Sequence, residues 1–175
     1  MVGEGVLLEC LRHPLVRKVL SVSRRPLRLT HPKLRELLVP DFGQLAAHAE
    51  TLTGYDACFY CAGISSVGLS ETAYTRVTLT LTLDFARVVA RCNPHLVFNF
   101  VSGVYTDSSG KGPLMWARVK GKAENALVQL PFKGAYNFRP GFMRPTRAQQ
   151  HVKLLFKALQ LFYPYLFPKA TLTFA

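Results

Sequence analysis

The chain has 175 residues, 49% of them hydrophobic, and this size and composition predict one folded domain with a sizeable core. Lysine and arginine outnumber aspartate and glutamate by 22 to 10, so the formal net charge is +12 and the surface should attract anions. The basic residues are scattered and match no nucleic-acid motif, so we expect no nucleic-acid partner. No apolar run is long enough to span a membrane and no signal peptide is evident, so we expect a cytoplasmic protein.

Short apolar runs alternate with longer helical patterns along the chain. Strands are predicted over Lys18–Ser23, Glu36–Asp41, Tyr55–Ala62, Leu96–Ser102 and Ala135–Arg139, and helices over Gly5–Arg12, Leu45–Leu52, Ser70–Cys92 and Pro113–Leu130. Continuous apolar strands that alternate with helices are typical of a doubly wound, mainly parallel sheet. The predicted fold class is therefore α/β of the Rossmann type, with ligands bound at the carboxyl ends of the strands.

The segment Ser70–Cys92 carries two competing patterns. Threonine and leucine alternate over Thr78–Leu83, which is the period of a strand. Apolar side chains also recur every three or four residues over the whole segment, which is the period of a helix. A strand longer than about 20 residues would be abnormal, so we predict a helix.

The N-terminal residues depart from the pattern of a Rossmann domain. Such a domain should open with a strand and a glycine-rich turn that holds a pyrophosphate at a helix N-terminus. Here Met1–Gly5 leads directly into an amphipathic segment. We therefore expect the first strand to be missing or incomplete, with Gly3 as the last glycine of the turn; helix capping is the alternative role of Gly3.

Two strand ends carry charged residues that suit a phosphorylated dinucleotide. Arg24 and Arg25 follow the strand Lys18–Ser23, at the position where arginine accommodates the extra phosphate of NADP and an acidic residue would bind the ribose of NAD. A solvated basic loop is the alternative. Asp41 ends the next predicted strand and could accept a hydrogen bond from an adenine amino group, although a turn-initiating aspartate is equally consistent.

The strand Tyr55–Ala62 ends in Cys61-Ala62-Gly63, where small residues let the backbone approach a flat ligand. Cys58 and Cys61 have the C-x-x-C spacing of redox and zinc motifs. Side chains three positions apart on a strand point to opposite faces, so we predict buried packing instead. The histidines show no metal-ligand spacing either, and no metal site is predicted.

The second half of the chain carries the most specific pattern. Ser102 ends a strand, Trp116 and Lys120 follow with a spacing of four on a predicted helix, and Arg139-Pro140-Gly141 follows the last strand. In these features the chain resembles the short-chain dehydrogenase/reductase superfamily, in particular its atypical and extended branch of NAD-dependent epimerase/dehydratase-like proteins. The likeness runs from Met1 to about Pro145.

The resemblance implies roles for these residues. Ser102 takes the position of the serine that orients the substrate carbonyl, and Lys120 that of the lysine that holds the ribose and lowers the pKa of a catalytic tyrosine. Trp116 occupies the tyrosine position, and an indole cannot act as a general acid near neutral pH. Tyr105 is a candidate to supply the hydroxyl instead. Arg139, Pro140 and Gly141 are expected to line the cofactor site.

The sequence thus predicts an NAD(P)-binding oxidoreductase-like domain over residues 1–145, with NADP favoured, NAD as the alternative cofactor and a small molecule as substrate. Residues 146–175 would form a partial substrate or lid segment of the same globular unit. Its amphipathic stretch His151–Tyr163 could also lie on a membrane surface. A catalytically silent dinucleotide sensor or interaction module is the alternative function, and a homo-oligomer is compatible with either.

Overall fold

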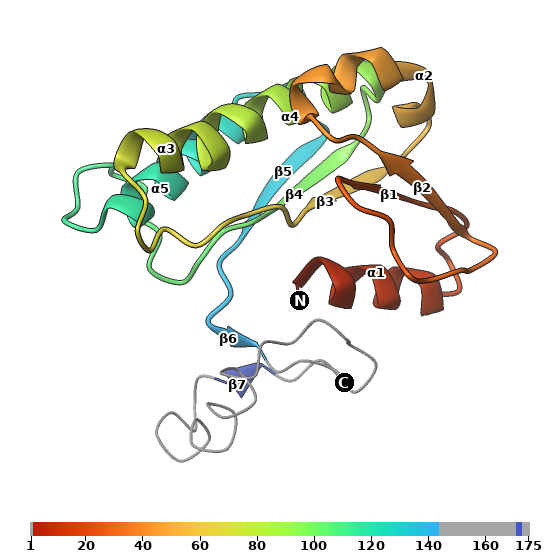
Figure 1. The fold of residues 1–175 in the computed structure, drawn as a ribbon, viewed down its shortest axis with the longest axis horizontal. Coiled ribbons are helices and arrows are strands. Elements are labelled where there is room, and N and C mark those ends of the chain that lie inside the picture. Colours follow the sequence, from red (N-terminus) through yellow and green to blue (C-terminus); the bar gives the residue numbers. More distant parts are fainter. Residues whose placement is uncertain (1, 144–170, 173–175) are drawn as a thin grey trace.

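The computed structural model of the chain describes residues 2–143 and 171–172. The predicted amphipathic stretch His151–Tyr163, and with it most of the expected substrate segment, lies outside the described residues. Figure 1 shows the arrangement of the described part, with helices above and below a layer of strands.

The strands form parallel sheets, as the sequence predicts. β1 (Val19–Ser23) pairs with β2 (Leu34–Leu38), and a second sheet has the order β3-β4-β5, formed by Ala57–Tyr60, Val97–Val101 and Gly134–Phe138. A short parallel pair, β6 (Phe142–Met143) with β7 (Thr171–Leu172), lies apart from both sheets. Together with the helices between the strands, this parallel arrangement confirms the α/β fold class of the Rossmann type.

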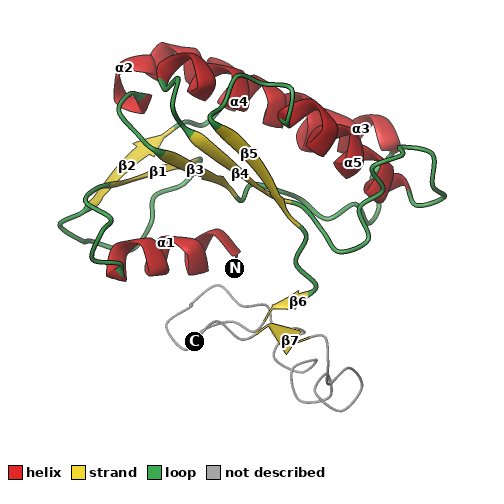
Figure 2. Ribbon diagram, turned by 180° about the vertical axis from the view of Figure 1, so that it is seen from behind, coloured by secondary structure: helices red, strands yellow, loops and turns green. Residues whose placement is uncertain are grey.

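The helices lie on both sides of the strand layer. They are α1 (Val2–Arg12), the 3-10 helix η1 (Phe42–His48), α2 (Ala49–Leu52), α3 (Glu71–Thr75), the π-helical turn η2 (Arg76–Thr80), α4 (Leu81–Cys92) and α5 (Met115–Leu127). Figure 2 shows α2 to α5 on one face of the strands and α1 on the other. The main core therefore lies between the sheet β3-β4-β5 and the helices α4 and α5.

The segment with two competing patterns is helical. Ser70 caps its start, because its Oγ accepts a hydrogen bond from the backbone N–H of Ala73 at 3.2 Å. The alternating threonines fall on η2 and α4, where Thr82 Oγ1 donates to the carbonyl of Thr78 at 2.8 Å. Tyr74 and Phe85 are buried, as the helical period requires. Burial of a continuous apolar stripe outweighs the local strand-like alternation.

Several predicted boundaries were wrong, most of all that of Glu36–Asp41. The strand β2 begins at Leu34 and ends at Leu38, so Asp41 does not end a strand. Val39 makes the last contact with β1, donating its N–H to the carbonyl of Ser23 at 2.9 Å. Pro40 then ends the ladder because it has no N–H. The helix predicted over Leu45–Leu52 begins earlier, at Phe42, and its first part is a 3-10 helix.

Large apolar side chains fill the space between the central strand β4 and its helices. Phe98 of β4 and Val119, Ala123 and Leu127 of α5 are completely buried. Tyr60 of β3 stacks against this group, with its ring centroid 6.1 Å from that of Phe98. A large side chain such as Phe98 or Leu127 contributes about 1.5–3 kcal/mol by leaving water, so this packing holds α5 against the sheet.

An opening separates the two sheets. Among the described residues no strand lies between β1 and β3, and a cavity of about 1980 Å³ extends between them. This is the position of the strand that the sequence analysis expects to be missing or incomplete.

Candidate functional site

Ser102 lies at the carboxyl end of β4, where the chain leaves the sheet. Its N–H donates to the carbonyl of Phe138 on β5 at 2.7 Å, which extends the ladder by one residue. The side chain is buried, and its Oγ lies 2.8 Å from Oγ1 of Thr106, which is also buried. The turn that follows brings Thr106 back, because its N–H donates to the carbonyl of Gly103 at 3.0 Å. Two hydroxyl groups therefore meet at this strand end.

Lys120 reaches the same strand end from α5. Its Nζ donates a hydrogen bond to the carbonyl oxygen of Ser102 at 2.9 Å. Burial lowers the pKa of Lys120 from its ordinary value, and the nearby Glu124 carboxylate partly offsets this by raising it. The structure thus brings together Ser102 and Lys120, which the sequence assigned to one site from positions 18 residues apart.

Trp116 lies one helical turn before Lys120, at the position where the resemblance places a tyrosine. Its ring packs beside Gly103, where Cζ3 would be 3.6 Å from an added Cβ. The indole is half-buried and so belongs to the wall of the site. Tyr105 is 74% exposed and has no hydrogen-bond partner in residues 2–143. Thr106, rather than Tyr105, supplies the hydroxyl that contacts Ser102.

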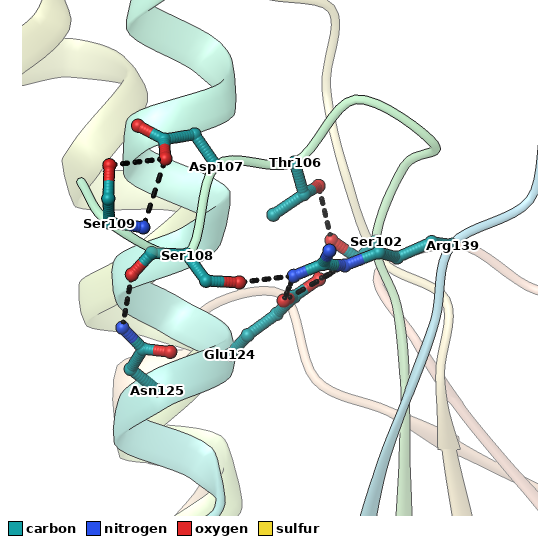
Figure 3. A network of polar contacts seen from close by, with 8 residues as sticks. All are labelled: Ser102, Thr106, Asp107, Ser108, Ser109, Glu124, Asn125 and Arg139. Carbon is teal, nitrogen blue, oxygen red and sulfur yellow. Dashed lines mark hydrogen bonds and ion pairs between the residues drawn. The ribbon is translucent and has the colours of Figure 1, made fainter. Parts of the chain in front are cut away.

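An ion pair between an exposed arginine and a buried glutamate joins α5 to the end of β5 (Figure 3). Glu124 is only 3% exposed, and its carboxylate accepts from Nε of Arg139 at 3.0 and 3.2 Å and also from Nη2. The Glu124 carboxylate raises the pKa of the guanidinium. Arg139 Nη2 also donates to Oγ of Ser108. The guanidinium of Arg139 thus holds helix, strand and loop together, and its expected place in the lining of a cofactor site stays a prediction.

The loop between Ser102 and α5 is organised by Asp107. Its Oδ1 accepts from the N–H and Oγ of Ser109 at 2.9 and 2.6 Å, and its Oδ2 accepts from the N–H of Gly112 at 2.6 Å. The hydrogen bond from the Ser109 hydroxyl and those from backbone N–H groups lower the pKa of Asp107. Asn125 anchors the loop to α5 by donating to the carbonyl of Ser108 at 2.8 Å. Hydrogen bonds within the loop and to α5 therefore hold it beside the site.

Close contact between this loop and α5 requires a glycine. A Cβ at Gly121 would lie 1.8 Å from the carbonyl oxygen of Asp107 and 3.1 Å from Cα of Ser108. Because backbone atoms on both sides are involved, no side-chain rotation can relieve the overlap. Gly121 thus lets the loop pack directly on the helix next to Lys120.

The two arginines predicted to select NADP lie at the carboxyl end of β1. Arg24 and Arg25 are exposed and form no ion pair with residues 2–143. The turn that carries them is fixed by Ser23, whose Oγ donates to the carbonyl of Arg25 at 2.7 Å. Asp41 caps η1, since its Oδ1 accepts from the N–H of Gly43 at 2.9 Å. Its carboxylate thus has the turn-forming role that the sequence left open.

The carboxyl end of β3 meets the N-terminus of α1. A Cβ at Gly3 would lie 3.2 Å from Cβ of Cys61, so a larger residue there would crowd the strand end. Ala62 and Gly63 are exposed, and no atom lies within 4 Å of a Cβ added to Gly63. This strand end is therefore exposed, and its role in ligand binding stays a prediction. Pro140 and Gly141 follow β5, and Gly141 also has open space around it.

The cysteines Cys10, Cys58, Cys61 and Cys92 are free thiols of intermediate exposure, and Cys61 follows the end of β3. Burial raises the pKa of Cys58 to about 12, with a smaller contribution from Cys61. Burial also raises the pKa of Cys61 to about 11. In residues 2–143 no group of three or more histidine, cysteine or carboxylate side chains could hold a metal ion. In that same part of the chain, no helix combines the length and hydropathy needed to cross a bilayer.

Sequence reasoning missed three residues that shape the site. Thr106 contacts the Ser102 hydroxyl, and Glu124 forms an ion pair with Arg139. Gly121 lets the loop that contains Asp107 and Ser108 pack against α5. A signal existed for Glu124, because it lies four positions after Lys120 and so one helical turn further along the same face. Nothing in the sequence alone specified that its partner would come from the last strand.

No protein-family model matches the chain. Protein HTATIP2 of Rattus norvegicus is 28% identical over 149 residues, which cover 84% of this chain and 60% of that protein. The chain thus spans less than two thirds of the length of this curated relative.

Solved structures show the same fold. A short-chain dehydrogenase from Burkholderia cenocepacia J2315 in complex with NADP superposes with a TM-score of 0.63 and 17% identity, over 94% of this chain and 79% of that one. MoeE5 in complex with UDP-glucuronic acid and NAD superposes with a TM-score of 0.66 and 19% identity, over 91% of this chain and 57% of that one. The chain therefore shares the Rossmann-type fold of these two structures, which confirms the fold class predicted from its sequence.

Proposed function

We propose that this chain binds a nicotinamide dinucleotide, preferentially NADP(H), and belongs functionally with the oxidoreductases of the short-chain dehydrogenase type. The observation that carries the proposal is the contact between Lys120 and Ser102 at the carboxyl end of a central parallel strand. In open α/β sheets ligands bind at such strand ends. Similar folds bind the proposed cofactors, since the Burkholderia cenocepacia structure contains NADP and MoeE5 contains NAD.

The described residues fit a dinucleotide at three strand ends. Ala62 and Gly63 leave open space at β3, and the exposed guanidinium groups of Arg24 and Arg25 at β1 have the planar geometry that suits a phosphate. Lys120, held at β4, would donate to ribose hydroxyls. When bound, such a cofactor supplies or accepts a hydride. Asp41 and Arg139 are occupied by the contacts described above, so we do not include them in the proposed cofactor site.

Because Trp116 stands at the position where the resemblance places a tyrosine, the site has fewer side chains that can transfer a proton. The hydroxyls of Ser102 and Thr106 can donate to a carbonyl oxygen of a small substrate. Lys120 is the group beside them whose lowered pKa eases release of a proton. Trp116 can only donate a hydrogen bond. We therefore propose slow reduction or oxidation of a carbonyl or hydroxyl substrate, with proton transfer depending on Lys120.

Titration with NADPH and NADH tests the proposed cofactor preference. NADPH should bind more tightly, because the extra phosphate meets two exposed guanidinium groups. The double variant Arg24→Ala/Arg25→Ala should lose about tenfold in NADPH affinity, or about 1.4 kcal/mol, and leave NADH binding nearly unchanged. Arg28→Ala, which removes another exposed arginine of the same loop, is the matched control and should have little effect. Equal affinity of the wild-type protein for both dinucleotides would contradict the preference.

A further inference from the structure

The loop that follows β4 carries apolar residues at the centre of a turn beside the proposed site. The N–H of Thr106 donates to the carbonyl of Gly103 at 3.0 Å, and Val104 and Tyr105 lie between them. Turn centres favour glycine, proline, asparagine and aspartate. Both central side chains are exposed, so formation of the turn does not explain why they are a valine and a tyrosine.

The loop that follows β3 contains a second turn of this kind. The N–H of Leu69 donates to the carbonyl of Ser66 at 3.1 Å, and Gly68 has a φ of 77°. A positive φ at the third position is typical of a type II turn, and the second position is then Val67. The side chain of Val67 is 87% exposed. This turn therefore also presents an apolar residue to solvent at a position where proline is common.

The two loops lie side by side (Figure 1 and Figure 2). Because β3 and β4 are parallel neighbours, with Tyr60 opposite Phe100, the loops leave the sheet at the same edge. At their far ends Arg118 of α5 joins them, since its guanidinium donates to Glu71 at 2.6 Å and to the carbonyl of Gly112 at 2.7 Å. We call the exposed apolar residues of the two loops the apolar rim; they are Ile64, Val67, Leu69, Val104 and Tyr105.

The apolar rim borders the hydroxyl groups of the proposed site. The turn ties Val104 to Thr106, whose Oγ1 lies 2.8 Å from Oγ of Ser102. Trp116 adds an aromatic ring beside Gly103. Small-molecule sites are commonly apolar, with a few polar groups that fix the orientation of the ligand. A carbonyl compound that reaches the two hydroxyls would therefore have its remaining atoms beside apolar side chains.

The same loops offer no partner for an anionic substrate. Residues 63–70 and 102–110 contain neither lysine nor arginine, and their one charged residue is Asp107. On α5, Arg118 is paired with Glu71, and Lys120 donates to the carbonyl of Ser102. Burial of an unpaired phosphate or carboxylate against apolar groups is costly. The apolar rim therefore favours an uncharged compound over a nucleotide sugar or an acid.

We propose that the site binds an uncharged apolar carbonyl compound, such as an aromatic or long-chain ketone, with its body against the apolar rim. This inference rests on the proposed function, because it assigns the substrate class of the same strand end. The carbonyl oxygen accepts a hydrogen bond from the hydroxyl pair of Ser102 and Thr106. The apolar body covers Val67 and Val104 and thereby leaves water.

Trp116 is the single tryptophan of the chain and reports binding without turnover. The probe is prodan, an uncharged naphthyl ketone that accepts excitation energy from tryptophan, and NADP⁺ is present because it carries no hydride to transfer. Energy transfer should saturate as prodan is added. Benzylacetone, an apolar ketone, should displace the probe, whereas glyceraldehyde and UDP-glucose should not. Absence of saturable transfer, or equal displacement by the polar compounds, would overturn the proposal.

Variants of the rim show where the probe binds. Val67→Ser/Val104→Ser should weaken prodan binding by about tenfold, because two apolar contacts are lost. Val128→Ser is the matched control, since Val128 is nearly as exposed as Val104 but lies at the opposite end of α5, and it should match the wild type. Equal affinity of the double variant and the wild type would contradict the assignment. A dimer that the double variant dissociates, detected by size-exclusion chromatography, would also contradict it, since a second copy would then cover the rim.

Titration with NADPH separates this inference from the proposed function. Val67→Ser/Val104→Ser should bind NADPH as tightly as the wild type, because the rim contacts the substrate and not the dinucleotide. Binding of NADPH without binding of prodan would reject the substrate class and leave the cofactor proposal standing. Binding of prodan at the rim without binding of NADPH would reject the proposed function and leave the rim as a binding surface for apolar ketones.

Discussion

Replacement of Gly121 by alanine is expected to lower the free energy of unfolding by about 3 kcal/mol, at the upper end of the usual cost of overpacking. The added Cβ would overlap the carbonyl oxygen of Asp107 at 1.8 Å, so either α5 or the loop must move. Urea denaturation followed by circular dichroism measures the change.

The same substitution should also disturb the site. Gly121 is the neighbour of Lys120 on α5, and a shift of the helix would lengthen the 2.9 Å contact with Ser102. Gly63→Ala is the matched control, because nothing lies within 4 Å of its added Cβ, and it should leave stability within about 0.5 kcal/mol of wild type. Equal stability of both variants would show that the loop does not pack on α5 as described.

Replacement of Arg139 by alanine is also expected to lower the free energy of unfolding substantially. It would leave the carboxylate of Glu124, only 3% exposed, without its guanidinium partner. Removal of one partner of a fully buried ion pair costs about 3–5 kcal/mol; because the Arg139 side chain is 39% exposed and water would reach the carboxylate, we expect about 2 kcal/mol. Thermal and urea denaturation at neutral pH measure the loss.

A double variant separates the cost of an unpaired charge from the loss of packing. Glu124→Leu/Arg139→Met replaces both partners by apolar side chains and should recover most of the stability lost in Arg139→Ala. If the double variant were as unstable as Arg139→Ala, the ion pair would owe its effect to side-chain packing, and the buried charge would not be the cause.

The pattern of the elements predicted the parallel sheet, whereas the resemblance to a known family implied that Ser102 and Lys120 belong to one site. Alternation of strands and helices sets the direction of every strand, so residues at strand ends and on the following helix gather at one edge. Such a rule does not depend on individual side-chain contacts.

Contacts that depend on particular side chains could not be predicted. Asp41 was placed at a strand end, but Pro40 stops the ladder earlier and Asp41 caps a helix instead. The sequence also did not indicate that Arg139 would pair with Glu124, which lies on another element 15 residues away in sequence. Strand ends and ion pairs of this kind follow from packing between elements, and hydrophobic periodicity carries no information about it.

The most direct measurement is isothermal titration of NADPH into the wild-type protein, Lys120→Ala and Lys122→Ala. Both lysines lie on α5, but Lys120 is held at Ser102 and Lys122 is exposed. The wild-type protein should bind, Lys120→Ala should bind at least about tenfold more weakly, and Lys122→Ala should match the wild type. Equal small effects of the two substitutions, or no binding by the wild-type protein, would contradict a dinucleotide site at the end of β4.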